Sequence, residues 1–319
     1  MANYKGVKGF KVQSLASDPT FDSGQVWYNT ASSALKYAAI GAGAWAAGGN
    51  LNQAREEAGS GKNGTQSAGM IFGGNYPGAG YADQTEQYNG SAWTEVGDML
   101  KGRSWPLGSG INTAAMAVGG NYPTDTNYTE LWNGSSWSEM TDSNTWHVGG
   151  GSTGTTTAFL AVSGSSTPTG GNNVEVWNGS TWTEVNNVLS KSSYAGCVGT
   201  TSSAICYGDS PANAKNEIWD GTCWTEGNNL NTARYGMGSF GIVTAAMAAG
   251  GNTGSMTGVT EQYNGTSWTE VGDLGTARSS VGAFGTTALG AVAGGAPVGL
   301  DATEEWDEAP ESVKTVTVS

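Results

Sequence analysis

Basic residues are scarce in this sequence of 319 residues. Lys and Arg together number 13 against 27 Asp and Glu, which gives a formal net charge of −14. A chain with this charge is repelled by nucleic-acid phosphates and by anionic membrane surfaces. We therefore expect no nucleic acid among its partners.

Long hydrophobic stretches are missing as well. Residues 1–10 lack the apolar core of a signal peptide, and no apolar run in the sequence approaches the roughly 18 residues that cross a bilayer. We expect neither a secretory signal nor membrane insertion.

Histidine is almost absent, since His147 is the only one. A single histidine is too few for a zinc or copper site, so we expect no metal and no cofactor. His147 follows Trp146 at the predicted start of a strand, and we expect it at the surface or in a turn.

The three cysteines, Cys197, Cys206 and Cys223, lie in one stretch and do not form the pattern of a disulfide framework. Cys197 and Cys206 could face each other across a hairpin. We favour the alternative, in which they are small buried apolar residues in a reducing compartment.

What the sequence has in abundance is glycine, with 52 residues, arranged in a repeat. An aromatic residue, Asn-Gly or Asp-Gly, two further residues and a tryptophan recur five times. The tryptophans Trp93, Trp137, Trp182, Trp224 and Trp268 are 44, 45, 42 and 44 residues apart. Asn-Gly between β-rich runs predicts a tight hairpin turn, because both of its residues tolerate positive φ.

Each hairpin is preceded by two more predicted strands. One is a run of small apolar residues that ends in Gly-Gly, as at residues 114–120 and 245–251, and before it comes a glycine-rich strand often opened by Ala-Arg. We name the four strands a, b, c and d in chain order. Four short antiparallel strands in about 44 residues fit one blade of a propeller.

The run Met116-Ala117-Val118-Gly119-Gly120, followed by Tyr122 and by spaced aromatic residues, resembles the kelch repeat. The resemblance covers residues 44–307 and implies an all-β, kelch-like β-propeller. It implies no particular activity, because kelch propellers serve as scaffolds, binding modules and occasionally enzymes.

The repeat also predicts how the ring closes. Strand c occurs six times, but its last copy, around Trp306, is not followed by a strand d. Residues 44–55 align with residues 223–234, which makes Trp45 the missing d-strand tryptophan. We predict six blades over residues 44–307, closed by a strand from the N-terminal side, with an N-terminal arm at 1–43 and a C-terminal tail at 308–319.

Glutamate recurs two residues before the aromatic residue of every strand c, and all four arginines open a strand a. A catalytic pair needs an environment of its own, whereas a residue present in every blade meets a need that every blade shares. We therefore predict structural contacts that tie adjacent blades. The structural repeat comprises Glu86, Glu130, Glu175, Glu217, Glu261, Glu304 and the tryptophans Trp45, Trp93, Trp137, Trp182, Trp224 and Trp268.

Two hypotheses of enzymatic function have less support than this structural interpretation. The hairpins are similar to the Asp boxes of sialidases, but Tyr or Trp stands where the Asp belongs. Copper-radical chemistry, known in one propeller family with kelch repeats, needs several histidines. We expect no catalytic residues.

The connections between strands b and c vary most in sequence, and loops on a rigid scaffold commonly carry recognition. They place Tyr76, Tyr81, Tyr122 and Tyr128 on one face, together with Trp146 from a d–a connection. These residues are candidates for an aromatic platform that binds a sugar or a protein. The alternative is that the tyrosines simply pack on the rim.

Residues 1–43 lie outside the repeat. Residues 7–14 alternate like a strand, and residues 24–37 predict a hairpin with Trp27, Leu35 and Tyr37 on its apolar side. The latter stretch resembles hairpins near the N-termini of phage structural proteins, especially tail-fibre and adhesin chains.

The sequence therefore predicts a non-enzymatic virion protein that is oligomeric in the particle. Residues 1–43 would bind other virion proteins, and the propeller would attach to a host-surface glycan or protein or decorate the particle. The alternatives are a cellular, cytoplasmic kelch interaction module and, third, a glycan-active enzyme.

Overall fold

The computed structural model describes residues 12–19, 25–39, 43–164, 171–190, 193–308 and 312–316. It divides into two compact units, one of residues 44–307 and one formed by the two chain ends, residues 1–43 and 308–319.

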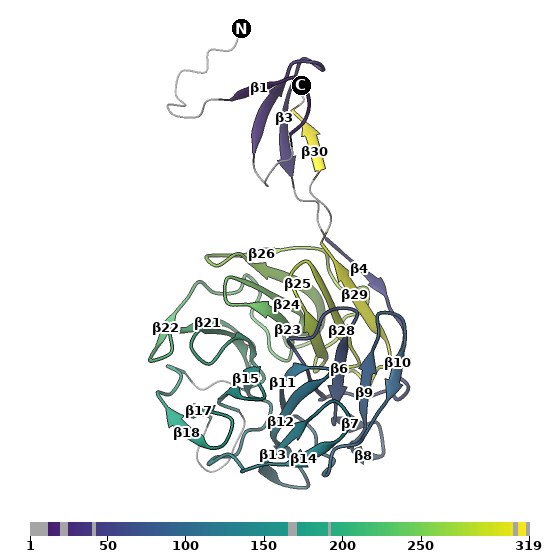
Figure 1. Ribbon diagram of the computed structural model, residues 1–319, viewed down its shortest axis with the longest axis vertical. Coiled ribbons are helices and arrows are strands. Elements are labelled where there is room, and N and C mark those ends of the chain that lie inside the picture. Colours follow the sequence, from purple (N-terminus) through teal and green to yellow (C-terminus); the bar gives the residue numbers. More distant parts are fainter. Residues whose placement is uncertain are drawn as a thin grey trace. The chain divides into compact units, whose positions relative to one another are not determined.

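The larger unit is a six-bladed β-propeller, as predicted. Six four-stranded antiparallel sheets are arranged in a ring, and in each the first strand of the repeat is innermost (Figure 1). In the order a, b, c, d the first three blades are β5 (Gly59–Ser60), β6 (Gly69–Phe72), β9 (Thr85–Tyr88), β10 (Trp93–Glu95); β11 (Leu107–Ile111), β12 (Ala114–Asn121), β13 (Asp125–Trp132), β14 (Trp137–Glu139); and β15 (Gly151–Thr155), β16 (Ala158–Val162), β17 (Val174–Trp177), β18 (Trp182–Val185).

The other three blades are β19 (Gly196–Gly199), β20 (Ala204–Asp209), β21 (Asn213–Trp219), β22 (Trp224–Glu226); β23 (Gly238–Ile242), β24 (Ala245–Asn252), β25 (Met256–Tyr263), β26 (Trp268–Glu270); and β27 (Gly282–Gly285), β28 (Leu289–Ala293), β29 (Thr303–Asp307), β4 (Ala44–Ala47). A two-stranded hairpin, β7 (Asn75–Tyr76) and β8 (Gly80–Tyr81), lies in the b–c connection of blade 1.

The predicted closure is confirmed. Strand β4 is the outermost strand of blade 6, where Trp45 pairs with Trp306 of β29 (Figure 1). The edge that an open ring would leave is thereby paired with a strand from the other end of the same unit.

The d-strand tryptophans tie neighbouring blades. The Trp137 indole donates to Thr85 Oγ1 of blade 1 at 2.9 Å, and the Trp93 indole donates to Thr303 Oγ1 of blade 6, also at 2.9 Å. Because both tryptophans are buried, each indole N–H needs a partner, and the threonine that precedes the c-strand glutamate provides it.

Cys197 and Cys206 form a disulfide, so the expectation of free thiols was wrong for this pair. The two residues lie opposite each other in β19 and β20, and both are buried. The register that makes them direct neighbours could not be fixed from their spacing. Cys223 is free and exposed.

The smaller unit is one four-stranded sheet in the order β1 (Gln13–Leu15), β2 (Val26–Asn29), β3 (Ala34–Ala39), β30 (Ser312–Thr315). We name it the terminal sheet, because β30, from the C-terminal segment, pairs with β3 (Figure 1). The predicted 24–37 hairpin is present as β2 and β3, whereas most of the strand predicted over residues 7–14 lies outside the described residues.

The apolar side predicted for this hairpin was wrong. Trp27 is opposite Lys36 and is fully buried, with its indole donating to Asp18 Oδ1. Leu35 is opposite Tyr28, so it points to the other face of the sheet. Because side chains alternate along a strand, Trp27 cannot share a face with Leu35 and Tyr37 in this register.

Candidate functional site

The repeated c-strand glutamates have a structural role. In every blade the carboxylate accepts a backbone N–H from the segment that enters the blade. The six donors, from blade 1 to blade 6, are Asn52, Leu100, Asn144, Leu189, Asn231 and Gly275. All six glutamates are buried, with exposed fractions of 0–7%. A carboxylate held in this way positions a connection rather than a substrate.

The arginines complete these contacts in four blades. Arg55, Arg103, Arg234 and Arg278 form ion pairs with Glu86, Glu130, Glu261 and Glu304, respectively. Each pair lies within one blade, so its arginine and glutamate tie the incoming connection to strand c. The prediction that these pairs join adjacent blades was therefore wrong.

His147 occupies the arginine position of blade 3, and the prediction of a surface or turn residue was wrong. It is 1% exposed, with Nε2 2.9 Å from Glu175 Oε2 and Nδ1 2.8 Å from the Ser163 carbonyl. Although burial alone would raise it, the pKa of Glu175 is lowered, because His147, Asn144 and Thr145 all hydrogen-bond to the carboxylate.

A ring of backbone hydrogen bonds surrounds the propeller axis at the start of the a strands. Each ring residue donates its N–H to the carbonyl of its counterpart in the preceding blade, at 2.5–3.1 Å, and the sixth bond closes the ring. All six residues have φ between 55° and 64°. They are Glu57, Trp105, Gly149, Tyr194, Gly236 and Ser280.

Two of these positions carry large aromatic side chains in a conformation that suits glycine. The Trp105 and Tyr194 rings are 4.5 Å apart, edge to face, on either side of Gly149. A Cβ on Gly149 would lie 2.5 Å from the Tyr194 ring, so only glycine fits between them. Tyr235 extends the group, with its ring 6.1 Å from that of Tyr194. We name Trp105, Tyr194 and Tyr235 the axial aromatic group.

Glu57 stands beside this group in the ring. Burial raises the pKa of its carboxyl, and the charge of Glu56 adds to the effect, while hydrogen bonds from Ser104 and Trp105 oppose it. The axial site therefore combines half-buried aromatic rings with a carboxylate that accepts hydrogen bonds.

Of the predicted platform, the structure brings Tyr81 and Tyr122 together. Their rings are 5.5 Å apart and both are exposed, at 38% and 46%. The Tyr81 hydroxyl donates to Asn121 Oδ1 at 2.7 Å. Asn121 in turn pairs through its backbone with Ser104, the neighbour of Trp105. The Tyr81–Tyr122 pair thus adjoins the axial site on the face that carries the b–c connections, which we call the b–c face.

The other platform candidates are placed differently. The Tyr76 hydroxyl is 2.5 Å from Gln84 Oε1, and burial raises the pKa of Tyr76 to about 12. The Tyr128 ring is covered by Lys101, whose Nζ is 3.7 Å from the ring centroid. Trp146 is 42% exposed on the same face.

Sequence reasoning missed the axial aromatic group. A usable signal exists, because the ring residue stands two positions after the repeated arginine or histidine, as Trp105 follows Arg103 and Gly149 follows His147. An alignment of the ring positions shows aromatic residues in blades 2 and 4, where the other blades carry small or polar residues.

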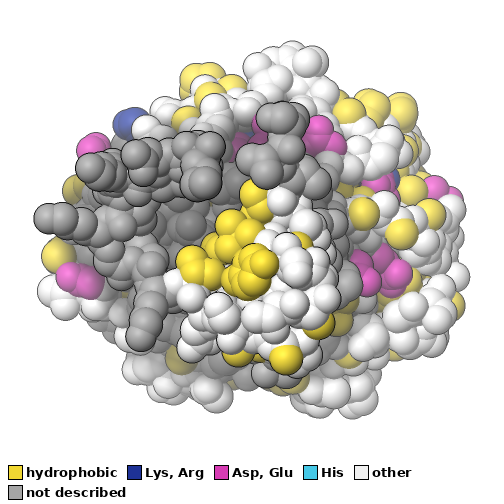
Figure 2. Space-filling model, turned by 90° about the horizontal axis from the view of Figure 1, so that it is seen from above, with side chains coloured by type: hydrophobic (Ala, Val, Ile, Leu, Met, Phe, Trp, Pro, Cys, Tyr) yellow, Lys and Arg dark blue, Asp and Glu magenta, His cyan; other side chains and the backbone are white. Residues whose placement is uncertain are grey.

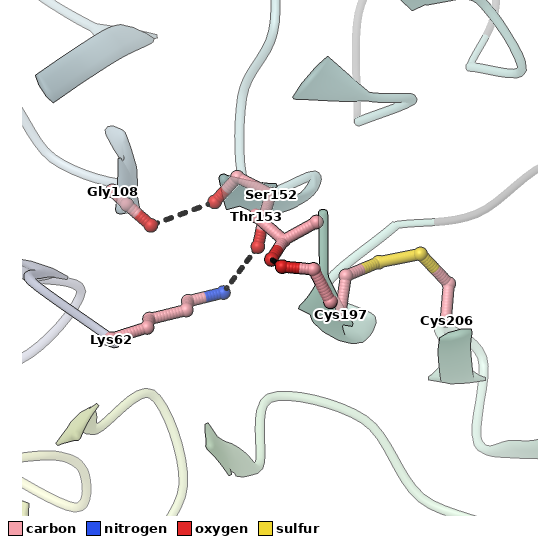
Figure 3. The surroundings of a disulfide bond; sticks show 7 residues. Lys62, Gly108, Ser152, Thr153, Cys197 and Cys206 are labelled. Carbon is pink, nitrogen blue, oxygen red and sulfur yellow. Dashed lines mark hydrogen bonds between the residues drawn. A yellow bond between two sulfur atoms is a disulfide. The ribbon is translucent and has the colours of Figure 1, made fainter. Parts of the chain in front are cut away.

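Below the ring lies an axial cavity of about 70 Å³, lined by residues of all six blades. It is far smaller than the roughly 300–1,000 Å³ of typical ligand pockets, so it suits water molecules rather than a sugar. Lys62 extends along it and donates to the Ser152 carbonyl at 3.3 Å, while Ser152 Oγ donates to the Gly108 carbonyl (Figure 3). Burial lowers the pKa of Lys62 to about 8.

The turn that carries Lys62 differs from its counterparts. The a–b turn of blade 1 spans residues 61–68, whereas the other five have two to four residues. Asn63 bonds to the carbonyls of Gly110 and Gly154, in blades 2 and 3, and Gln66 bonds to the Trp306 carbonyl in blade 6. This turn therefore crosses the axis on the face opposite the b–c face.

A larger hollow, of about 630 Å³, lies at the outer surface between blades 3 and 4. Its polar lining is already bonded internally, since Asn186 Nδ2 donates to the Thr222 carbonyl at 2.8 Å. The aromatic residue that lines it, Trp219, is 1% exposed. It is a weaker candidate than the b–c face.

Among the described residues, no group of three or more His, Cys, Asp or Glu side chains could hold a metal ion. The described part of the chain also has no helix that is both long and apolar enough to cross a membrane. No protein-family model matches the chain, and no curated protein matches it either.

Proposed function

We propose that this chain is a kelch-type attachment protein of a phage particle, without catalytic activity. In this proposal the terminal sheet binds other virion proteins, and the propeller displays its b–c face to a glycan or protein of the host surface. The kelch-like repeat and the phage-like stretch at residues 24–37 support the two halves of the proposal.

The observation that carries it is that the chain has two units, each with its own exposed apolar group. On the terminal sheet, Val26, Tyr28, Leu35 and Tyr37 share one face and are all at least 36% exposed. Figure 2 shows a patch of hydrophobic side chains near the centre of the view, with others scattered around it. On the propeller, Tyr81 and Tyr122 form the exposed pair on the b–c face. Exposed apolar groups of this kind mark interaction surfaces.

The carboxylates that repeat through the propeller favour a binding role over catalysis. Their oxygens are occupied by backbone N–H groups and arginines, as in Glu261, which is bonded to Asn231, Thr232 and Arg234. A general acid or base has to reach the atom that it protonates or deprotonates, and these groups are buried.

A reconstruction of the virion tests the proposal. We expect the face of the terminal sheet that carries Tyr28 and Leu35 to be covered by another virion protein, with the b–c face turned outward. A reconstruction in which the b–c face is buried against the particle would contradict attachment and favour particle decoration.

A further inference from the structure

Two members of the axial aromatic group are held in a backbone conformation with a steric cost. Trp105 and Tyr194 have φ of 55° and 58°, a region that bulky residues seldom occupy, while the equivalent positions of blades 3 and 5 are glycine. All six ring positions share this φ, so what distinguishes blades 2 and 4 is that they carry a bulky aromatic side chain there in spite of the steric cost. The ring of six backbone hydrogen bonds fixes both residues in the same way.

The charges near this group favour an uncharged ligand over an anionic one. All four arginines are at most 1% exposed and are paired with glutamates, so none is available at the surface. In the described part of the propeller the lysines are Lys62 in the axial cavity, Lys101 against Tyr128, and Lys215. Glu56 and Glu57 add negative charge at the ring.

From these observations we infer that the axial end of the b–c face binds an uncharged sugar ring of a neutral polysaccharide. Trp105 and Tyr194 offer apolar ring surfaces for the C–H groups of the sugar, and the Glu57 carboxylate accepts hydrogen bonds from its hydroxyls. Because the cavity beneath is only about 70 Å³, the sugar lies across the mouth and not within the axis. The inference rests on the proposed attachment function and names its ligand class.

The position of the exposed tyrosines fits a chain longer than one sugar. Tyr81 bonds to Asn121, and Asn121 pairs with Ser104 beside Trp105, so the aromatic surface continues from the axis toward the rim. A linear polysaccharide that occupies the axial site would meet Tyr81 and Tyr122 with its next residues.

The inference is tested by measuring how the 319-residue chain binds neutral polysaccharides (laminarin, mannan and dextran) and acidic ones (alginate and hyaluronate). We expect at least one neutral polysaccharide to bind and neither acidic one. Raising the NaCl concentration about tenfold should change the affinity less than about twofold, because no ion pair is screened.

Substitutions of the axial residues test whether the polysaccharide binds at this site. Trp105→Ala and Tyr194→Ala should each weaken binding about tenfold or more. Ile242→Ala, which removes a 60% exposed side chain at the a–b turn of blade 5, on the opposite face, should leave it unchanged. Trp105→Ala removes a large side chain and therefore also tests the fold. Glu57→Gln keeps the shape of the side chain and removes only its charge, and we expect this variant to bind about threefold more weakly or worse.

The inference is overturned if no neutral polysaccharide binds, if the acidic ones bind more tightly, or if the Trp105, Tyr194 and Glu57 variants bind normally. Adsorption of particles to host cells separates this failure from failure of the attachment function. Normal adsorption by the Trp105→Ala variant contradicts the sugar site and leaves attachment standing. Polysaccharide binding without any adsorption to cells supports the sugar site and contradicts attachment.

Discussion

Arg234 donates from Nη1 to Glu261 Oε1, and both side chains are completely buried in blade 5. The same carboxylate accepts N–H groups from Asn231 and Thr232, so it holds the connection from blade 4 against strand c. Removing either partner of this buried ion pair leaves the other charge buried and unpaired, which destabilises the connection that the pair fixes.

Replacing Glu261 should therefore be far more costly than replacing a glutamate of strand d. We expect Glu261→Ala to lower the free energy of unfolding by about 3–5 kcal/mol. The matched control is Glu270→Ala, which lies opposite Glu261 in the neighbouring strand but is exposed, and it should change stability by less than about 0.5 kcal/mol. Urea unfolding measures both, and equal effects would contradict the structural role.

Blade 3 should respond to acid through Glu175. Its folded pKa is lowered, so the stability that it contributes is present above its unfolded pKa, about 4.3, and is lost as the pH falls through the folded value. His147→Gln weakens the interactions that lower this pKa. We expect the acid unfolding midpoint of this variant to move to higher pH, as followed by tryptophan fluorescence.

Asp125→Asn, which changes a carboxyl elsewhere on the b–c face, is the control for general effects of charge. If His147→Gln unfolds at the same pH as the unchanged protein, the bond between His147 and Glu175 does not contribute to acid stability.

Lys62 should oppose folding at neutral pH. Its folded pKa of about 8 lies below the unfolded value of about 10.4, so between these values the unfolded chain binds more protons. Through this group stability rises with pH across that interval. Lys62→Met should be more stable than the unchanged protein below pH 8, by up to about 3 kcal/mol, and the difference should shrink toward pH 10.4.

Lys101→Met, at a lysine that packs on Tyr128 outside the cavity, is the control and should not show this pH-dependent gain. A Lys62→Met protein whose stability relative to the unchanged protein is constant from pH 7 to 10.4 would show that the ammonium is not desolvated on the axis.

Much of the propeller could be predicted because each blade repeats the same solution. The Asn-Gly turns, the Gly-Gly ends of strands b and the position of Trp45 were sufficient for the number of blades and for the closing strand. The pairing of β30 with β3 was not predictable, because it joins two chain ends that share no repeat. The face of Trp27 was misjudged because the hairpin register depends on where its turn begins.

The candidate site was predictable only where it lies in variable loops. Tyr81 and Tyr122 were found in this way, but Trp105 and Tyr194 stand at the start of strands a, where the repeat suggested only structural residues. Their meeting across Gly149 depends on ring closure between blades 2 and 4. Contacts of this kind follow from the curvature of the whole ring and not from any local pattern.

The central claim is that the two units have separate functions, and paired surface variants of the full chain in assembled particles test it most directly. Tyr81→Ser with Tyr122→Ser should leave incorporation into the particle unchanged and lower adsorption to host cells about tenfold or more, because exposed aromatic residues carry binding without carrying the fold. Tyr28→Ser with Leu35→Ser should prevent incorporation. Normal adsorption by the first variant, or normal incorporation of the second, would contradict the account.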